Sequence, residues 1–342
     1  MISELSSPSL DLDRLTPYLE QHLAGFLGPV RATKFPGGQS NPTWLIETPG
    51  GRYVLRRQPP GQLLKSAHAV DREFRVLSAL AQTPVPVARA WHLCEDRDVI
   101  GSLFYLMSYE EGRIFWNPAL PEVDRDARRG YYSAIVTTLA ALHDVDPERV
   151  GLSDYGRPGN YFQRQIELWT KQYRAAETAC IAPMEALIEW LPAHCPADAQ
   201  RPALVHGDLR IDNLIFAADA PRVQAILDWE LSTLGNPLAD LAYFCMCLRL
   251  PSKGHITGLR GQDRAALGIP EEKEMIAQYC ALRGLPGIAN WHFYLAFSFF
   301  RLASIAQGVK ARALQGNASS ANAHEVGSMV EPLASLASEL IA

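Results

Sequence analysis

The most informative part of the chain is Val205-His206-Gly207-Asp208-Leu209-Arg210-Ile211-Asp212-Asn213-Leu214-Ile215-Phe216. Asp208 and Asn213 are separated by four residues, and apolar runs flank the segment that contains them. A second acid, Asp228, follows another apolar run, 223–227. The runs 214–216 and 223–227 predict a β-hairpin, which returns Asp228 to the side of Asn213. The pattern therefore predicts that two carboxylates and an amide lie close together.

This set of side chains fits phosphoryl transfer, which needs a carboxylate to take the acceptor's proton and oxygen ligands for magnesium. We expect Asp208 to be the base, and Asn213 and Asp228 to be the metal ligands. Arg210 either stabilises the transferring phosphoryl group or is simply solvated, and both interpretations stay open. A solvated acidic turn is the alternative for the whole set, and the apolar runs on both sides of Asp208 argue against it.

The motifs His206-Gly207-Asp208-x-x-x-x-Asn213 and Asp228-Trp229-Glu230 resemble those of the aminoglycoside phosphotransferase and choline kinase-like family. The segments 55–61 and 66–68 are similar to the branch that is fused to acyl-CoA dehydrogenases in animals. The resemblance extends from about residue 34 to about residue 308. It implies ATP or GTP as the phosphate donor, Mg2+ as cofactor and a small-molecule hydroxyl compound as acceptor.

The resemblance and the patterning predict an α+β, protein kinase-like fold with two lobes. The first lobe, 1–109, is expected to hold an antiparallel sheet with helices, and the second, 110–342, to be mainly helical. Apolar alternation and turn residues predict strands, and apolar residues at helical spacing predict helices. The predicted strands are 31–35, 43–47, 53–57, 88–94 and 102–109, and the predicted helices are 11–26, 67–80, 131–143, 160–174, 184–191, 241–250, 293–305 and 326–341.

A glycine-rich connector at 36–41 lies between two predicted strands. Gly37 and Gly38 would let backbone N–H groups approach nucleotide phosphates, and Ser40 and Asn41 would add donors. The connector alone is equally consistent with a plain turn, but its position ahead of the 205–216 stretch favours phosphate binding. The chain has no GxxxxGK[ST] motif, which argues against a P-loop fold.

Arg56 stands where related kinases carry a lysine that contacts phosphates, and the resemblance implies that it does the same here. Glu73 lies on the apolar face of the helix predicted at 67–80, where an unpaired charge is costly, so we expect Arg56 to pair with it. A purely structural pair is the alternative. By the resemblance, Met107 and Tyr109 lie at the hinge between the lobes and contribute to adenine binding.

The composition of the chain argues against several classes of protein. With 32 basic and 37 acidic residues the formal charge is −5, which argues against a nucleic-acid-binding protein. No secretory signal is evident, and the apolar run at 293–305 contains Arg301 and is short for a bilayer span. The six cysteines have no CxxC spacing, so free thiols are expected. These features predict a cytoplasmic protein without a membrane partner, and they give no indication of an oligomeric state.

The acceptor side is less defined. Arg249, Arg301 and the basic loop at 251–261 favour an anionic acceptor over a cationic aminoglycoside, although Arg301 would alternatively pair with Asp240. The resemblance suggests a hydroxy acid or its CoA thioester. A nucleotide-binding pseudokinase is the rival hypothesis, because Arg56 replaces the lysine. Protein kinase activity is disfavoured because no Ala-Pro-Glu follows Asp228, and a serine hydrolase because no GxSxG is present.

Overall fold

The computed structural model describes residues 10–35, 41–59, 68–157, 159–197, 201–254, 256–316 and 322–341. The chain divides into two compact units, which we describe separately. Unit 1 comprises Met1–Gln82 and Val87–Glu111, and unit 2 comprises Thr83–Pro86 and Gly112–Ala342. Within unit 2, the backbone N–H of Ile226 donates to the carbonyl oxygen of Pro86 at 2.9 Å. The predicted lobe boundary at residue 109 stays a prediction.

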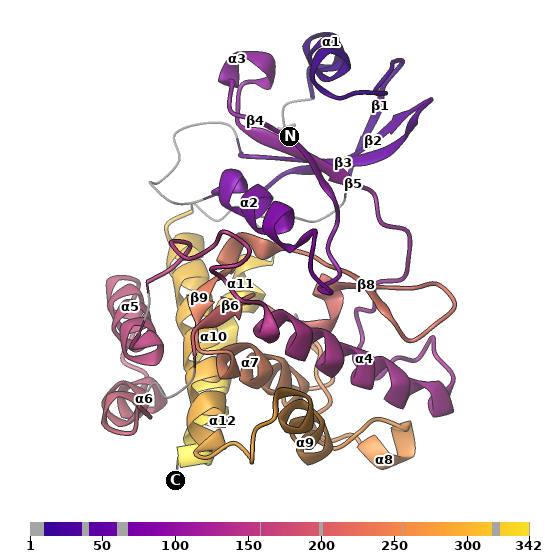
Figure 1. Ribbon diagram of the computed structural model, residues 1–342. Helices are drawn as coiled ribbons and strands as arrows, with labels where there is room; N and C mark the ends of the chain where they lie inside the picture. Colours follow the sequence, from indigo (N-terminus) through magenta and orange to yellow (C-terminus); the bar gives the residue numbers. More distant parts are fainter. Residues whose placement is uncertain are drawn as a thin grey trace. The chain divides into compact units, whose positions relative to one another are not determined.

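Unit 1 is a five-stranded antiparallel sheet with three helices, as the sequence predicts (Figure 1). The strand order is β1-β2-β3-β5-β4. Its elements are α1 (Leu12–His22), β1 (Arg31–Lys34), β2 (Thr43–Thr48), β3 (Gly51–Arg57), α2 (Val70–Leu80), β4 (Ala90–Cys94), α3 (Arg97–Ile100) and β5 (Phe104–Ser108). The β2–β3 hairpin closes at the pair Thr48 and Gly51, where Pro49-Gly50 forms the turn.

The two faces of this sheet are covered by different helices. One face packs its apolar side chains, among them Leu55 and Phe104, against Leu15 and Leu19 of α1 and Ile100 of α3. Figure 1 shows α1 and α3 on this side of the sheet and α2 on the other. Successive strand residues point to opposite faces. The residues next to Leu55 and Phe104 along β3 and β5 are therefore directed toward α2.

Unit 2 is mainly helical and contains two small antiparallel β-ladders. Its helices are α4 (Arg125–Asp144), α5 (Tyr161–Ala175), α6 (Ala182–Ala193), α7 (Leu238–Leu248), α8 (Arg264–Leu267), α9 (Glu272–Arg283), α10 (Trp291–Leu314), α11 (Ala323–Ser328) and α12 (Val330–Ile341). The ladders pair β6 (Ala203–Val205) with β9 (Thr233–Gly235), and β7 (Leu214–Phe216) with β8 (Val223–Ile226). The predicted hairpin is thus present.

Several helices of unit 2 differ from the sequence-based expectation. Helix α4 begins six residues before the predicted start at Tyr131, because its first turns are polar and carry no apolar period. Helix α9 was not predicted, although a capping box formed by Glu271 and Glu274 marks its start. The last predicted helix is two helices, which meet at Met329.

The core of unit 2 lies around α7 and α10. All eleven residues of α7 are buried, and so are fourteen of the 24 residues of α10. Figure 1 shows α5, α6 and α12 beside α10. The six cysteines are free thiols, four of them buried, while Cys180 is exposed and Cys195 is half-buried. In the described part of the chain, no helix combines the length and apolarity needed to cross a bilayer.

Candidate functional site

In unit 1 the strand register brings Arg56 and Tyr105 side by side on the face that looks toward α2. Both side chains contact the carboxylate of Glu73 on α2. Arg56 Nε lies 2.9 Å from Glu73 Oε2, and the Tyr105 hydroxyl donates to the same oxygen at 3.0 Å. The carboxylate is 1% exposed. The expected pair of Arg56 and Glu73 is therefore present, and it is buried on the Glu73 side.

Asn41 completes this cluster and differs from its expected role. Its Nδ2 donates to Glu73 Oε1 at 2.8 Å, and its Oδ1 lies 3.1 Å from His68 Nδ1. The residue has no exposed surface. Because both ends of the amide are engaged inside unit 1, the side chain braces Glu73 and does not point outward as a phosphate donor.

The other residues expected at the nucleotide lie at the edges of the described part of unit 1. Gly37, Gly38 and Ser40 fall outside the described residues. Met107 lies within β5, which has paired strands on both sides, and Tyr109 follows the end of that strand. The Arg52 guanidinium lies 4.5 Å from the centroid of the Tyr109 ring. A nucleotide-binding role for Met107 and Tyr109 stays a prediction.

In unit 2 a buried carboxylate positions the loop that carries Asp208. Asp240 lies on the first turn of α7 and has no exposed surface. Its two oxygens accept the backbone N–H groups of His206 at 2.7 Å and Gly207 at 2.8 Å. Because Asp240 holds two successive N–H groups, the chain direction just before Asp208 is fixed.

The sequence around Asp208 suits this tight arrangement. Gly207 has a φ of +86°, and a Cβ atom there would lie 2.6 Å from the carbonyl oxygen of Leu231. A side chain at this position would therefore cause both strain and a clash. His206 connects the loop to the hairpin, since its Nε2 lies 2.8 Å from the carbonyl oxygen of Leu227. His206 therefore has a structural role in the loop.

A buried histidine and tyrosine support Asp240. His143 Nε2 lies 3.3 Å from Asp240 Oδ2, and its Nδ1 lies 2.7 Å from the hydroxyl of Tyr279. Burial lowers the pKa of His143, so the imidazole is neutral in the folded protein. Burial alone would raise the pKa of Asp240, but the hydrogen bonds from His143 and the Gly207 N–H lower it. Asp240 is therefore an ionised acceptor surrounded by donors.

The predicted base and metal ligands are connected by hydrogen bonds. Asn213 Nδ2 donates to the backbone oxygen of Asp208 at 2.8 Å and approaches its Oδ2 at 3.3 Å. The backbone carbonyl oxygen of Asn213 accepts the N–H of Leu227, the residue before Asp228, at 2.8 Å. The hairpin therefore brings the Asp208, Asn213 and Asp228 segments together, as the spacing predicted.

The residues present fit a magnesium ion. The side-chain Nδ2 of Asn213 is held by Asp208, which leaves the side-chain Oδ1 as the ligand atom. Asp228, whose backbone has a left-handed φ of 62°, would supply a carboxylate. Mg2+ prefers such oxygen ligands and is often held by few protein groups, with phosphates and water completing the shell. Among the described residues no group of three or more His, Cys, Asp or Glu side chains forms an alternative metal site.

Arg210 lies among acids. Its Nη2 is 3.0 Å from Asp212 Oδ2, and its Nε is 3.6 Å from Asp208 Oδ1. Burial alone would lower the pKa of Arg210, but the charges of Asp208 and Asp212 raise it. Burial raises the pKa of Asp212 in spite of the neighbouring Arg210. Arg210 is thus held next to the predicted base, which favours a role at the phosphoryl group over the alternative of a simply solvated side chain.

The arginines expected to face an anionic acceptor are engaged inside unit 2. Arg249 makes a bidentate pair with Glu272, with distances of 2.7 and 2.8 Å. Arg301 does not pair with Asp240. Its Nη1 donates to the carbonyl oxygen of Gly207 at 2.5 Å, and its guanidinium lies over the ring of Tyr243. His255 in the basic loop lies outside the described residues.

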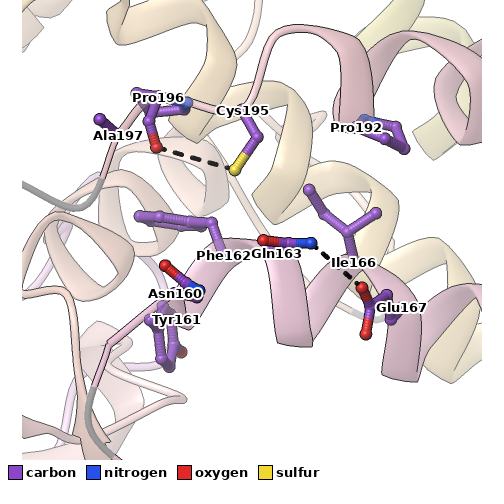
Figure 2. A pocket seen from close by; sticks show the side chains of 10 residues that line it. All are labelled: Asn160, Tyr161, Phe162, Gln163, Ile166, Glu167, Pro192, Cys195, Pro196 and Ala197. Atoms are coloured by element: carbon purple, nitrogen blue, oxygen red, sulfur yellow. Dashed lines mark hydrogen bonds between the residues drawn. The ribbon is translucent and has the colours of Figure 1, made fainter.

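A separate cavity of about 350 Å3 lies between the start of α5 and the segment after α6 (Figure 2). It contains none of the predicted site residues. Figure 2 shows the thiol of Cys195 directed toward Phe162, and Gln163 donates to Glu167 at 3.4 Å. Glu167 is the one charged side chain among the residues that line it, so the lining does not define a ligand.

The antiparallel sheet with its buried ion pair and the helical unit with its anchored acidic loop together define a phosphotransferase of kinase-like fold. The chain belongs to the APH phosphotransferase enzyme family, which matches residues 31–286. It is similar to a Ralstonia eutropha protein of known structure, provisionally named an aminoglycoside phosphotransferase, with 46% identity, a TM-score of 0.88 and coverage of 97% of this chain and 98% of that one.

Two further similarities extend this result. Mouse acyl-CoA dehydrogenase family member 10 is 50% identical over 325 residues, which cover 93% of this chain and 30% of that protein. The chain therefore spans about a third of the length of this relative. A thermostable mutant of the aminoglycoside phosphotransferase APH(4)-Ia, solved with AMP-PNP and hygromycin B, shares the fold at 14% identity, with a TM-score of 0.61 and coverage of 96% and 98% of the two chains.

We expect Glu73→Ala to destabilise the protein strongly, because it leaves the largely buried Arg56 without its carboxylate. Removing one partner of a buried pair costs about 3–5 kcal/mol. Glu47→Ala is the matched control in unit 1, since Glu47 lies 4.0 Å from the exposed Arg31 and such a pair contributes about 0–1 kcal/mol. Urea unfolding measures the free energy of unfolding of each variant. An equal decrease in the two variants would contradict the assignment of a buried ion pair.

We also expect stability to fall on acidification through His143. The unfolded imidazole takes up a proton near pH 6.5, whereas burial lowers the pKa of His143 in the folded state. Its contribution is therefore fully present above about pH 6.5 and is lost as the pH falls toward the folded-state pKa. Between about pH 7 and pH 5, the free energy of unfolding should fall less in His143→Gln than in the wild type.

The exposed His194 provides the control for this titration, because His194→Gln removes an imidazole without touching the Asp240 cluster. Urea unfolding at several pH values measures the slope. Part of the decrease in the free energy of unfolding with falling pH should remain in His143→Gln, because burial also lowers the pKa of His92. The account of a neutral, buried His143 is wrong if His143→Gln and the wild type have the same slope.

Proposed function

We propose that the chain transfers the γ-phosphate of ATP or GTP to a hydroxyl group of a small molecule in a magnesium-dependent reaction. The observation that carries this proposal is the link between the Asp208, Asn213 and Asp228 segments. Asn213 Nδ2 donates to Asp208, and the backbone carbonyl oxygen of Asn213 accepts from Leu227. A pseudokinase that only binds nucleotide has no need of an acid held in this way, so the geometry favours turnover.

Asp208 accepts the proton of the acceptor hydroxyl as its oxygen attacks the γ-phosphorus. Its side chain is 21% exposed, so the carboxylate is reachable while its backbone is fixed by Asp240 and Asn213. A base held in place before the reaction lowers the entropic cost of the attack. Arg210, next to Asp208, offers positive charge for the phosphoryl oxygens.

Asn213 and Asp228 would hold magnesium through their side-chain oxygens. The ion neutralises charge on the nucleotide phosphates. Arg56 would bind the phosphates, with Glu73 fixing its guanidinium at 2.9 Å. An arginine offers a planar fork with several donors where lysine offers a point charge, so phosphate binding by Arg56 does not require the usual lysine.

The donor and the acceptor are proposed from relatives. APH(4)-Ia has been solved with the ATP analogue AMP-PNP, which supports an adenine nucleotide. The 50% identity to an acyl-CoA dehydrogenase family member supports a hydroxy acid or its CoA thioester as acceptor. Since Arg249 and Arg301 are engaged internally, the proposal of an anionic acceptor rests on this relative and not on a cluster of unpaired arginines.

The test is a coupled assay of magnesium-dependent nucleotide consumption with a panel of hydroxylated metabolites that includes hydroxyacyl-CoAs. Asp208→Ala should lower kcat by about 10²–10⁴-fold, the usual contribution of a general base. Asn213→Ala and Asp228→Ala should raise the magnesium concentration that gives half-maximal rate. Asp219→Ala, an exposed acid in the same hairpin, serves as the matched control.

Two outcomes would overturn the proposed function. One is turnover in Asp208→Ala at the wild-type rate, which would exclude Asp208 as the base. The other is nucleotide binding by calorimetry without turnover of any acceptor in the panel, which would favour the pseudokinase hypothesis.

A further inference from the structure

A second cavity in unit 2 combines apolar walls with arginines. It has a volume of about 220 Å3 and lies where the end of α7 meets α8, α10 and α12. Leu248, Leu259 and Phe299 form its buried apolar wall, each at most 2% exposed. None of the residues assigned to phosphoryl transfer lines it.

The charged lining of this cavity is unbalanced. Arg249, Arg260 and Arg264 face it, and Glu339 is the one acid among the lining residues. Arg260 pairs with Glu339 at 3.1 Å, but the two side chains are 49% and 61% exposed. A pair as exposed as this contributes little to stability, so Glu339 can turn toward solvent when an anion takes its place beside Arg260.

Arg249 is a fixed part of this lining. Its Nε and Nη2 bind Glu272, which also accepts the indole N–H of Trp291 at 2.7 Å. Glu272 raises the pKa of Arg249 and holds its guanidinium in one orientation. A guanidinium that is already ordered loses little entropy when it binds a ligand.

Arg264 supplies uncompensated charge. Within the described part of the chain, its Nη1 is a buried donor without a hydrogen-bond acceptor, and no carboxylate pairs with it. Buried donors in folded proteins normally have a partner. Its Nη1 is itself inaccessible, so Arg264 contributes to the cavity through the charge of its guanidinium, which adds to that of Arg260 and favours an anion there.

From this combination we propose that the cavity binds a small amphiphilic carboxylate, a monoanion with a short alkyl chain. Guanidinium groups match the two oxygens of a carboxylate, and the leucine and phenylalanine wall accommodates the chain. The volume is below the roughly 300–1,000 Å3 of pockets for drug-sized ligands, so a nucleotide or an intact CoA thioester does not fit. The site is independent of the proposed catalytic function, and its test needs no turnover.

The test is isothermal titration of the whole chain with hexanoate, with hexanol, acetate and hexyl phosphate as comparisons. Hexanoate should bind with a defined stoichiometry of one. Hexanol lacks the charge and acetate lacks the chain, so both should bind at least about tenfold more weakly, the loss expected for one charge-assisted hydrogen bond or a few buried methylenes. Hexyl phosphate tests the other anion that guanidinium groups recognise.

Two variants and a control locate the binding. Arg260→Gln should weaken hexanoate binding about tenfold, and Leu340→Trp should block the cavity by filling it. Arg129→Gln should leave binding unchanged, because Arg129 is also paired with an exposed glutamate but does not line this cavity. Circular dichroism checks that each variant is folded, and the two independent variants keep the test decisive if one fails to fold.

The proposal is overturned if hexanoate shows no saturable binding, or if Arg260→Gln and Leu340→Trp bind it like the wild type. Equal affinity for hexanol would show an apolar site without anion recognition, and tighter binding of hexyl phosphate would assign the cavity to phosphate esters. Either result would replace the carboxylate proposed here.

Discussion

The hydrogen bonds from His206 and Gly207 to the buried carboxylate of Asp240 are the constraint on which the organisation of unit 2 depends. A carboxylate without exposed surface is costly unless donors surround it. Here the donors are two backbone N–H groups and His143, so the charge is satisfied only when the chain before Asp208 takes this one path. The glycine at 207 and the contact of Arg301 with its carbonyl oxygen follow from that path.

In unit 1 a buried carboxylate is likewise surrounded by donors, and one of them is a positively charged arginine. Glu73 is oriented by Arg56, Tyr105 and Asn41, which come from two strands and from the segment before β2. Removing one partner from such a cluster lowers the free energy of unfolding by much more than the intact pair contributes to it. Each unit therefore holds one buried carboxylate at the place where the proposed chemistry needs a fixed group. In unit 1 the fixed group is Arg56, the proposed phosphate-binding residue, and in unit 2 it is the loop that carries Asp208, the proposed base.

The sequence predicted those parts of the fold and site that depend on local pattern. Apolar alternation located the five strands of unit 1, and the apolar runs 214–216 and 223–227 predicted the hairpin that connects the Asn213 and Asp228 segments. Long-range partners were not predictable in the same way. The amide of Asn41 turned inward to Glu73, and Arg301 bound a carbonyl oxygen in place of Asp240. Helix α9 was missed because its apolar period is weak and because its N-cap is Glu271, where helix starts are normally recognised by Ser, Thr, Asp or Asn.

The most direct test of this account is the turnover of Mg·ATP by Asp240→Asn, measured beside its nucleotide affinity. An asparagine keeps the size of the side chain but presents an NH2 group to one of the two backbone donors, so the loop that carries Asp208 should shift. A displacement of about 1 Å can cost about 100-fold in rate, and we predict a loss of this order in kcat with nearly unchanged nucleotide affinity. Wild-type kcat in a folded Asp240→Asn protein would contradict the central claim that this buried carboxylate positions the base.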